Sequence, residues 1–221
     1  MINLKKNKQN LFYRLIFLIL FLSFISIEHA KSSFLDPQQE IIIKSVNNYL
    51  NNLEHMEGDF YQINPDNSSS VGKFYIRRPG KFRFDYENPS SLLLVSDSVW
   101  LGIIDRELKT FDRYPIRYAP LYSLLKKDVD LLNEARILSL ELFPKLLILS
   151  IESDTDTGEE IGEITLHFKI NEDEVQKDLL NLDLEQWFII DAQGLETNVK
   201  LTNIIYGIQA KHEYFRVKKP E

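Results

Sequence analysis

Residues that could catalyse a reaction or bind a metal are few in this chain and lie far apart. Beyond residue 30 the histidines are His55, His167 and His212, and their spacing matches no metal site. No serine lies in a G-x-S-x-G turn, and no phosphate-binding or dinucleotide-binding glycine pattern occurs. The acidic stretch 154–160 has some ligands of a calcium loop but lacks the last one, so we interpret it as a solvated turn. We therefore expect no catalytic residue, no metal and no cofactor.

Arg78 is the polar residue with the most unusual position. It ends an apolar strand face and directly precedes Pro79 and Gly80. An ionised guanidinium is costly to remove from water, and it cannot lose its charge as a carboxyl group can. If Arg78 points inward, it must bond to fixed acceptors such as the carbonyls of a neighbouring loop or helix end. The alternative is an ordinary arginine at the surface or edge of a sheet.

Three predicted strands within residues 72–97 position this arginine. Alternation in the first two gives one shared face to Phe74, Ile76 and Arg78, and then to Phe82, Phe84 and Tyr86. Pro79 and Gly80 interrupt the pattern, because proline has no N–H to donate and glycine tolerates a sharp bend. A turn at residues 88–90 leads into the third strand, which begins near Leu92.

The apolar residues of these early strands have two interpretations. Ordinary core packing explains many of them. However, one face of a wide, curved sheet needs much cover, and only two modest helical segments are available for it. Any space left uncovered would form an apolar cavity suited to acyl chains. The residues predicted to line it are Phe60, Phe74, Ile76, Phe82, Phe84, Tyr86, Leu92, Leu94, Trp100, Leu121 and Leu124.

The rest of the chain predicts helices only before and between strands. Asp36 has the features of an N-cap, with Pro37 at the first helical position and Gln39 completing a capping box. This helix should end near residues 51–54, and its apolar stripe consists of Ile42, Val46, Tyr49, Leu50 and Leu53. A short helical segment is expected at 120–131. Further strands are predicted at 56–64, 99–105, 108–114, 136–142, 146–153, 161–170, 182–191, 196–206 and 209–217. The pattern indicates an antiparallel sheet of about eleven strands, curled over its helices.

The first 30 residues have the pattern of a cleavable secretory signal peptide. A basic start precedes the apolar run at 15–25, and Ala30 ends a plausible cleavage site. An uncleaved anchor is the alternative, but this run is shorter than the ~20 residues of a membrane span. The expected mature chain, residues 31–221, forms a single domain. With 22 basic and 32 acidic residues it carries a formal charge of −10, which disfavours nucleic acid and anionic membranes as partners. The chain has no cysteine, so disulfides, thiolate metal sites and acylation on an N-terminal cysteine are excluded.

The order of several short motifs resembles the LolA family, the periplasmic carriers of outer-membrane lipoproteins. Arg78-Pro79 is followed by the sequence GKFRFDY, an Asn-Pro turn and LLVSD. Further matching pieces are DREL at 105–108, YPI at 114–116, Pro120-Leu121, Leu124-Leu125 and DAQGL at 191–195. The resemblance covers residues 60–206 and is closest to the alphaproteobacterial members of the family.

That resemblance implies an incomplete, half-open β-barrel, with helices that form a lid over an apolar cavity for acyl chains. Arg78 corresponds to the arginine that holds the lid shut through bonds to helix and loop carbonyls. The implied donor is an inner-membrane ABC-type lipoprotein release complex, and an outer-membrane receptor lipoprotein is an optional acceptor. A monomer in the periplasm is expected. The sequence departs from the family pattern at two places. Ser98 stands where many relatives have glycine. The segment after Trp100 also differs, so the pattern does not decide whether Leu101 and Ile103 line the cavity.

The sequence therefore favours a carrier that shields lipoprotein acyl chains between the inner and outer membranes. A sensor of the same fold, which binds lipidated or misfolded envelope proteins and regulates a partner, is the first alternative. An envelope hydrolase acting on lipid or glycan is the second, although no residue is nominated as its catalyst.

Overall fold

The computed structural model of the protein describes residues 35–154, 160–176 and 179–219. The chain divides into two units after Leu35, and all described helices and strands belong to the second unit. The signal peptide expected at residues 1–30 and most of the predicted acidic turn at 154–160 lie outside the described residues.

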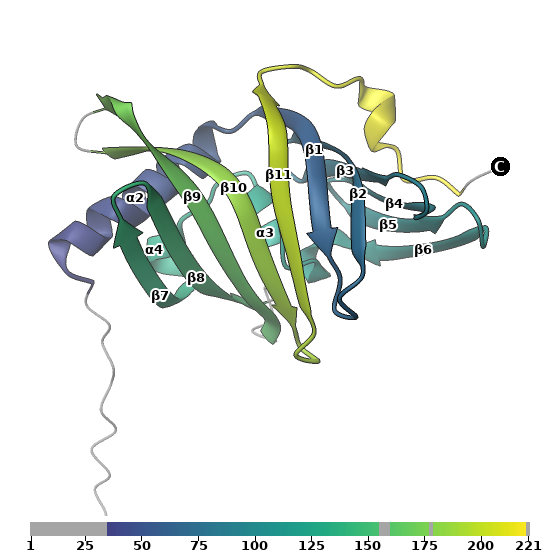
Figure 1. Cartoon of the computed structure of the whole chain (residues 1–221), viewed down its shortest axis with the longest axis horizontal. Coiled ribbons are helices and arrows are strands. Elements are labelled where there is room, and N and C mark those ends of the chain that lie inside the picture. The colour runs from purple at the N-terminus through teal and green to yellow at the C-terminus, as the bar shows by residue number, and fades with distance from the viewer. Residues whose placement is uncertain (1–34, 155–159, 177–178, 220–221) are drawn as a thin grey trace, which may run out of the picture. The chain divides into compact units, whose positions relative to one another are not determined.

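Within the described residues, eleven antiparallel strands form one sheet in the order β6-β5-β4-β3-β2-β1-β11-β10-β9-β8-β7 (Figure 1). The strands are β1 (His55–Ile63), β2 (Ser69–Arg77), β3 (Lys81–Tyr86), β4 (Leu92–Asp97), β5 (Trp100–Asp105), β6 (Thr110–Pro115), β7 (Arg136–Phe143), β8 (Leu146–Asp154), β9 (Glu160–Gln176), β10 (Leu179–Asp191) and β11 (Glu196–Tyr206). The helices are α2 (Pro37–Asn52), α3 (Tyr122–Leu125) and α4 (Leu131–Glu134), with 3₁₀ turns η1 (Ile116–Tyr118) and η2 (His212–Phe215). The predicted mainly β fold, an open antiparallel sheet with few helices, is confirmed.

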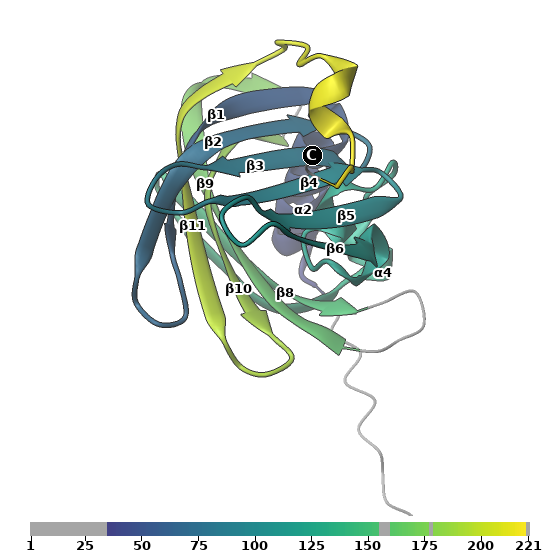
Figure 2. The same ribbon diagram turned by 90° about the vertical axis from the view of Figure 1, so that its right-hand side faces the viewer.

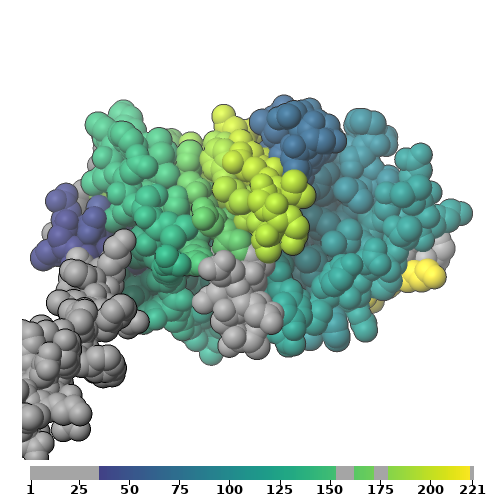
Figure 3. Space-filling model, turned by 90° about the horizontal axis from the view of Figure 1, so that it is seen from below, coloured from purple at the N-terminus to yellow at the C-terminus, as the bar shows by residue number. Residues whose placement is uncertain are grey.

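The sheet curls strongly, and the helices lie on its inner face (Figure 2). Its outermost strands, β6 and β7, do not pair with each other, so the barrel stays incomplete. In the view from below, the green strands β7–β9 and the teal strands β4–β6 lie at opposite ends (Figure 3). The β10–β11 hairpin and the β1–β2 hairpin lie between them.

The first helix forms as its sequence predicts. The Asp36 carboxylate accepts the N–H groups of Gln38 and Gln39, and the Gln39 side chain accepts the N–H of Asp36 in return. Its apolar stripe, including Val46 and Leu50, is buried against the sheet. None of the helices in the described part of the chain is long and apolar enough to span a membrane.

Residues 209–217 do not form the predicted strand. Strand β11 already pairs with β1 and β10, so the chain that follows Tyr206 has no free strand edge beside it. It instead crosses the outer face of the sheet, where η2 buries Phe215 to 1% exposure and Val217 packs on a small core of Leu93, Val95 and Ile104.

The predicted helical segment at 120–131 is also interrupted. It consists of α3 and α4, separated by residues 126–130. The helix ends at Leu125, and groups that follow β2 bond to the carbonyls that it leaves without helical partners. The N–H of Gly80 donates to the carbonyl of Leu125, and Arg78 donates to the carbonyls of Lys126 and Lys127.

Two glycines let aromatic rings lie directly against the strands. A Cβ added to Gly72 would lie 2.2 Å from the Asp85 carbonyl oxygen and 2.7 Å from the Phe60 ring. A Cβ at Gly58 would lie 2.9 Å from the ring of Phe74. The sheet therefore has no room for a side chain at either position.

We expect Gly72→Ala to lower the free energy of unfolding by about 3 kcal/mol, because the new methyl overpacks a closed site. Urea denaturation measures this change. Val71→Ala is the matched control, since Val71 is 42% exposed on the opposite face and should change stability by about 0.5 kcal/mol or less. Equal effects of the two substitutions would contradict this account.

Candidate functional site

The inner face of strands β1–β3 carries a cluster of aromatic side chains centred on Phe84. Residues paired across antiparallel strands share a face, and the register pairs Phe74 with Phe84 and Phe82 with Ile76. The ring centroid of Phe84 lies 5.3 Å from that of Phe60, 6.0 Å from that of Phe74 and 5.9 Å from that of Phe82. Each of these four side chains is 5% exposed or less. The cluster forms one continuous apolar surface.

Tyr86 adds a polar tip to the end of this cluster. Its ring packs edge-on against Phe60 at 4.9 Å, and its hydroxyl donates to Oε1 of Gln62 at 2.7 Å. Burial raises the pKa of Tyr86 to about 12, although the hydrogen bond to Gln62 acts in the opposite direction. The phenol is neutral at physiological pH with or without this shift, and burial extends the neutral form to more alkaline pH.

Most of the other predicted lining residues lie on the same side of the sheet. Ile76 is buried, and the register with β3 places Leu92 and Leu94 on the Phe84 face, where both are partly buried. Leu121 and Leu124 come from the helical cover, which consists of α2 and residues 116–135. Leu124 is 1% exposed. The structure does not bring Trp100 to this face.

Trp100 lies on the outer face instead. Strand β5 pairs Leu101 with Ser96 and Ile103 with Leu94, so these two residues, left open by the sequence, point inward. Trp100 alternates with Leu101, and its ring is covered on the outside by the guanidinium of Arg113 at 4.2 Å. The tight turn after Asp97 sets this phase, because the Asp97 carboxylate accepts the N–H groups of Val99 and Trp100.

Sequence reasoning missed Trp187, which belongs to the cluster. Its ring meets Phe84 edge-on at 6.0 Å, and it is 2% exposed. Simple alternation from Leu184 would point Gln186 inward. A register shift between Leu184 and Gln186 reverses the phase and turns Trp187 inward instead. A bulge of this kind leaves no reliable signal in a single sequence.

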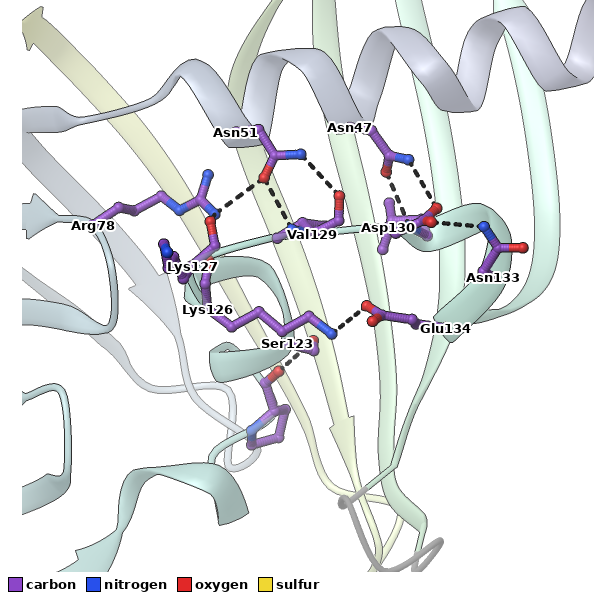
Figure 4. A network of polar contacts seen from close by, with 12 residues as sticks. Asn47, Asn51, Arg78, Ser123, Lys126, Lys127, Val129, Asp130, Asn133 and Glu134 are labelled. Carbon is purple, nitrogen blue, oxygen red and sulfur yellow. Dashed lines mark hydrogen bonds and ion pairs between the residues drawn. The ribbon is translucent and has the colours of Figure 1, made fainter.

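Arg78 reaches from the end of β2 to the helical cover (Figure 4). Its Nη2 donates to the carbonyl of Lys126, to that of Lys127 at 3.3 Å and to Oδ1 of Asn51 at 3.4 Å. Nε and Nη1 are buried and have no partner among the described residues. Desolvation lowers the pKa of Arg78, and the negative charge of Asp128 partly offsets it. The inward arginine thus has the carbonyl acceptors that its sequence position required.

The bend after Arg78 is fixed by its neighbours. The N–H of Gly80 donates to the Leu125 carbonyl at 2.7 Å, and the Ser96 hydroxyl donates to the Gly80 carbonyl at 2.8 Å. Ser98 has a φ of 86°, a conformation that favours glycine, and its hydroxyl donates to the Pro79 carbonyl at 2.8 Å. The serine therefore keeps the turn and adds a bond that glycine would not make.

Two asparagines of α2 complete the closing contacts, and sequence reasoning missed both. The side-chain amide of Asn51 accepts the N–H of Val129 at 2.9 Å and donates to its carbonyl at 2.8 Å. Asn47, one turn earlier, accepts the N–H of Leu131 at 3.0 Å (Figure 4). Their four-residue spacing places them on one side of the helix, which is the signal that could have identified them.

In this structure the aromatic side chains of the cluster pack against one another, whereas Leu94, Leu101 and Ile103 on the same face of β4 and β5 are only partly buried. A pocket of about 450 Å³ lies elsewhere, beside the end of α2, where Tyr49, Asp183 and Tyr206 border it. No group of three or more acidic or histidine side chains in the described part of the chain could hold a metal ion. The arrangement offers an apolar ligand this inner face, and movement of the cover away from the sheet would expose the aromatic cluster that is now buried.

The sequence profile described as "Outer membrane lipoprotein carrier protein LolA" matches residues 51–218, well over half of the chain. The chain belongs to the LolA family. The matched region includes the LolA-type Arg78 turn, the aromatic cluster and all eleven strands.

Two named LolA-family relatives and one solved structure show the extent of this similarity. An outer-membrane lipoprotein carrier protein of Halorhodospira halophila is 25% identical over 188 residues, which cover 81% of this chain and 82% of that protein. One of Methylococcus capsulatus is 38% identical over 72 residues, which are 29% of this chain and 35% of that protein. A LolA superfamily protein from Nitrosomonas europaea superposes with a TM-score of 0.42 at 8% identity, covering 79% of this chain and 97% of that one.

Burial of Tyr86 predicts a loss of folding stability at alkaline pH. The raised pKa means that its stabilising effect is complete below the unfolded pKa near 10 and is lost as pH rises towards 12. Tyr86→Phe should cost about 1 kcal/mol at pH 8, through the lost bond to Gln62. The variant should then lose about 2–3 kcal/mol less stability than the parent between pH 10 and 12. Unfolding free energies across this range test it, and parallel pH profiles would contradict it.

Proposed function

We propose that this LolA-family chain is a periplasmic chaperone that binds the acyl chains of lipoproteins and carries them from the inner to the outer membrane. The observation that carries the proposal is a continuous aromatic face, closed by a helical cover that polar contacts from Arg78 and two asparagines hold in place. A relative that matches 81% of the chain is named an outer-membrane lipoprotein carrier protein, which supports the same role.

The free energies of the closing hydrogen bonds and of acyl-chain burial suit reversible loading of cargo. Each closing hydrogen bond contributes about 0.5–1.5 kcal/mol, so the five or so bonds to Arg78, Asn47 and Asn51 together favour the closed state by several kcal/mol. Burying about ten methylene groups of an acyl chain contributes about 8 kcal/mol. Cargo can therefore open the cover, while the closing bonds still favour its release to a better acceptor.

The remaining features of the proposal follow from this role. Residues 1–30 direct secretion and are cleaved near Ala30, which leaves residues 31–221 as a single carrier domain. The carrier uses no cofactor and makes or breaks no covalent bond. An inner-membrane ABC-type release complex supplies the cargo, and either an outer-membrane receptor lipoprotein or the membrane itself accepts it. The carrier works as a monomer.

Two measurements test the proposed function. The mature protein purified from its native periplasm should contain lipid-modified polypeptides, identified by mass spectrometry. A fluorescent fatty acid should bind the emptied protein saturably. Failure of both would overturn the carrier role, and a stable complex with a signalling protein without transfer of cargo would favour the sensor.

Arg78→Leu should load cargo but release it slowly, because it removes the guanidinium bonds that favour the closed, empty state. A loss of about 1.5–3 kcal/mol corresponds to release about tenfold to a hundredfold slower. Transfer of a fluorescent acyl probe to acceptor vesicles measures the rate. Arg77→Leu is the matched control, since Arg77 ends β2 on the outer face and should leave the rate unchanged. Normal release by the Arg78 variant would exclude the proposed role of Arg78.

A further inference from the structure

The long helix of the cover is bonded to the sheet at two irregular points of one strand. The pairing of β10 with β9 shifts register between Leu179 and Asn181, and again between Leu184 and Gln186. At the first shift the N–H of Leu180 donates to the Ser45 hydroxyl at 3.0 Å. Beside the second, the N–H of Leu184 donates to the Tyr49 hydroxyl at 3.2 Å. Moving α2 away would leave both backbone amides without these partners.

Tyr49 also joins α2 to the neighbouring strands. Its ring packs edge-on against Phe168 of β9 at 5.5 Å, and its hydroxyl lies 3.3 Å from that of Tyr206 in β11. The Tyr206 hydroxyl in turn donates to the carboxylate of Asp183 at 2.9 Å. Beneath these contacts Ile43 and Val46 are fully buried, so α2 is fixed by apolar as well as polar contacts.

The rest of the cover, residues 116–135, is attached differently. It connects β6 to β7, the two outermost strands of the sheet, whereas α2 leads into β1 at the centre of the strand order. Its described polar contacts to the rest of the fold include those to the Arg78–Gly80 turn and to Asn47 and Asn51 of α2, and the N–H of Ile116 donates to the carbonyl of Val99 at 3.0 Å. An outermost strand is paired on one side only, so these two strands can move with less loss of pairing than β1 can.

We propose that the cover is divided: α2 stays fixed on the sheet, and acyl chains enter beneath residues 116–135 as strands β6 and β7 move apart. This inference rests on the proposed carrier function and specifies how its site opens. Residues 116–135 begin at the end of β6 and end at the start of β7. Separation of these two strands would therefore move the segment as well. The amides of Leu180 and Leu184 keep their partners on α2 throughout.

The absence of cysteine allows site-specific spin labels to test this division. One pair, Asp112→Cys with Glu141→Cys, reports the separation of β6 and β7. The control pair, Asn48→Cys with Lys200→Cys, reports α2 against the central strand β11. All four positions are exposed. Pulsed electron paramagnetic resonance then gives both distances with and without saturating palmitate.

Palmitate should lengthen the edge-strand distance by about one strand spacing, ~5 Å, and leave the control distance unchanged. A longer control distance would overturn the inference, and so would an unchanged edge-strand distance while palmitate is bound. Failure of palmitate to bind at all would overturn the carrier function and the divided cover together.

Two single substitutions, each added to both labelled pairs, distinguish the two parts of the cover without ligand. Asn51→Ala removes two of the hydrogen bonds between α2 and residues 116–135, and it should populate the longer edge-strand distance while keeping the control distance. Ser45→Ala removes one of the bonds that fix α2, and it should not lengthen the edge-strand distance. If Ser45→Ala opened the edges as far as Asn51→Ala, the division of the cover would be excluded.

Discussion

The cost of holding a guanidinium away from water is the constraint on which the closed fold depends. Arg78 lies at the end of an apolar face, and its charge is supported by carbonyl oxygens that α3 leaves free where it stops. The same contacts fix the chain after Leu125 and position it against Asn51. Sheet, bend and helical cover are thus coupled through one side chain that keeps its positive charge.

Two kinds of surface meet in this interior. The aromatic face is continuous and apolar, whereas polar groups close it at its margin: Arg78, the two α2 asparagines, and the Tyr86–Gln62 bond. Burial of apolar area is non-directional, so any acyl chain that covers this face gains free energy of binding. Hydrogen bonds, in contrast, require a fixed geometry. The interior of this LolA-family fold thus combines a non-directional apolar face with a geometrically fixed polar margin.

Much of this arrangement could be predicted from the sequence, because strand alternation and capping are local. The face shared by Phe74, Phe84 and Arg78 and the Asp36 cap follow from spacing alone. The inward turn of Trp187 and the outward turn of Trp100 depend on a bulge and on the phase of a tight turn. Such one-residue shifts reverse every later side chain, and alternation gives no warning of them. The course of residues 209–217 could not be predicted either, because it depends on which strand edges are already occupied.

The glycines at positions 58 and 72 have a further consequence for the aromatic face. They let the rings of Phe74 and Phe60 approach the neighbouring backbone where a Cβ would otherwise lie. The rings of this face meet mostly edge-to-face, with interplanar angles of 70° between Phe60 and Phe84 and 90° between Phe84 and Trp187, so the face has a fixed relief. A side chain at either glycine would have to displace one of these rings, so the two glycines set how deep the aromatic face lies beneath the cover.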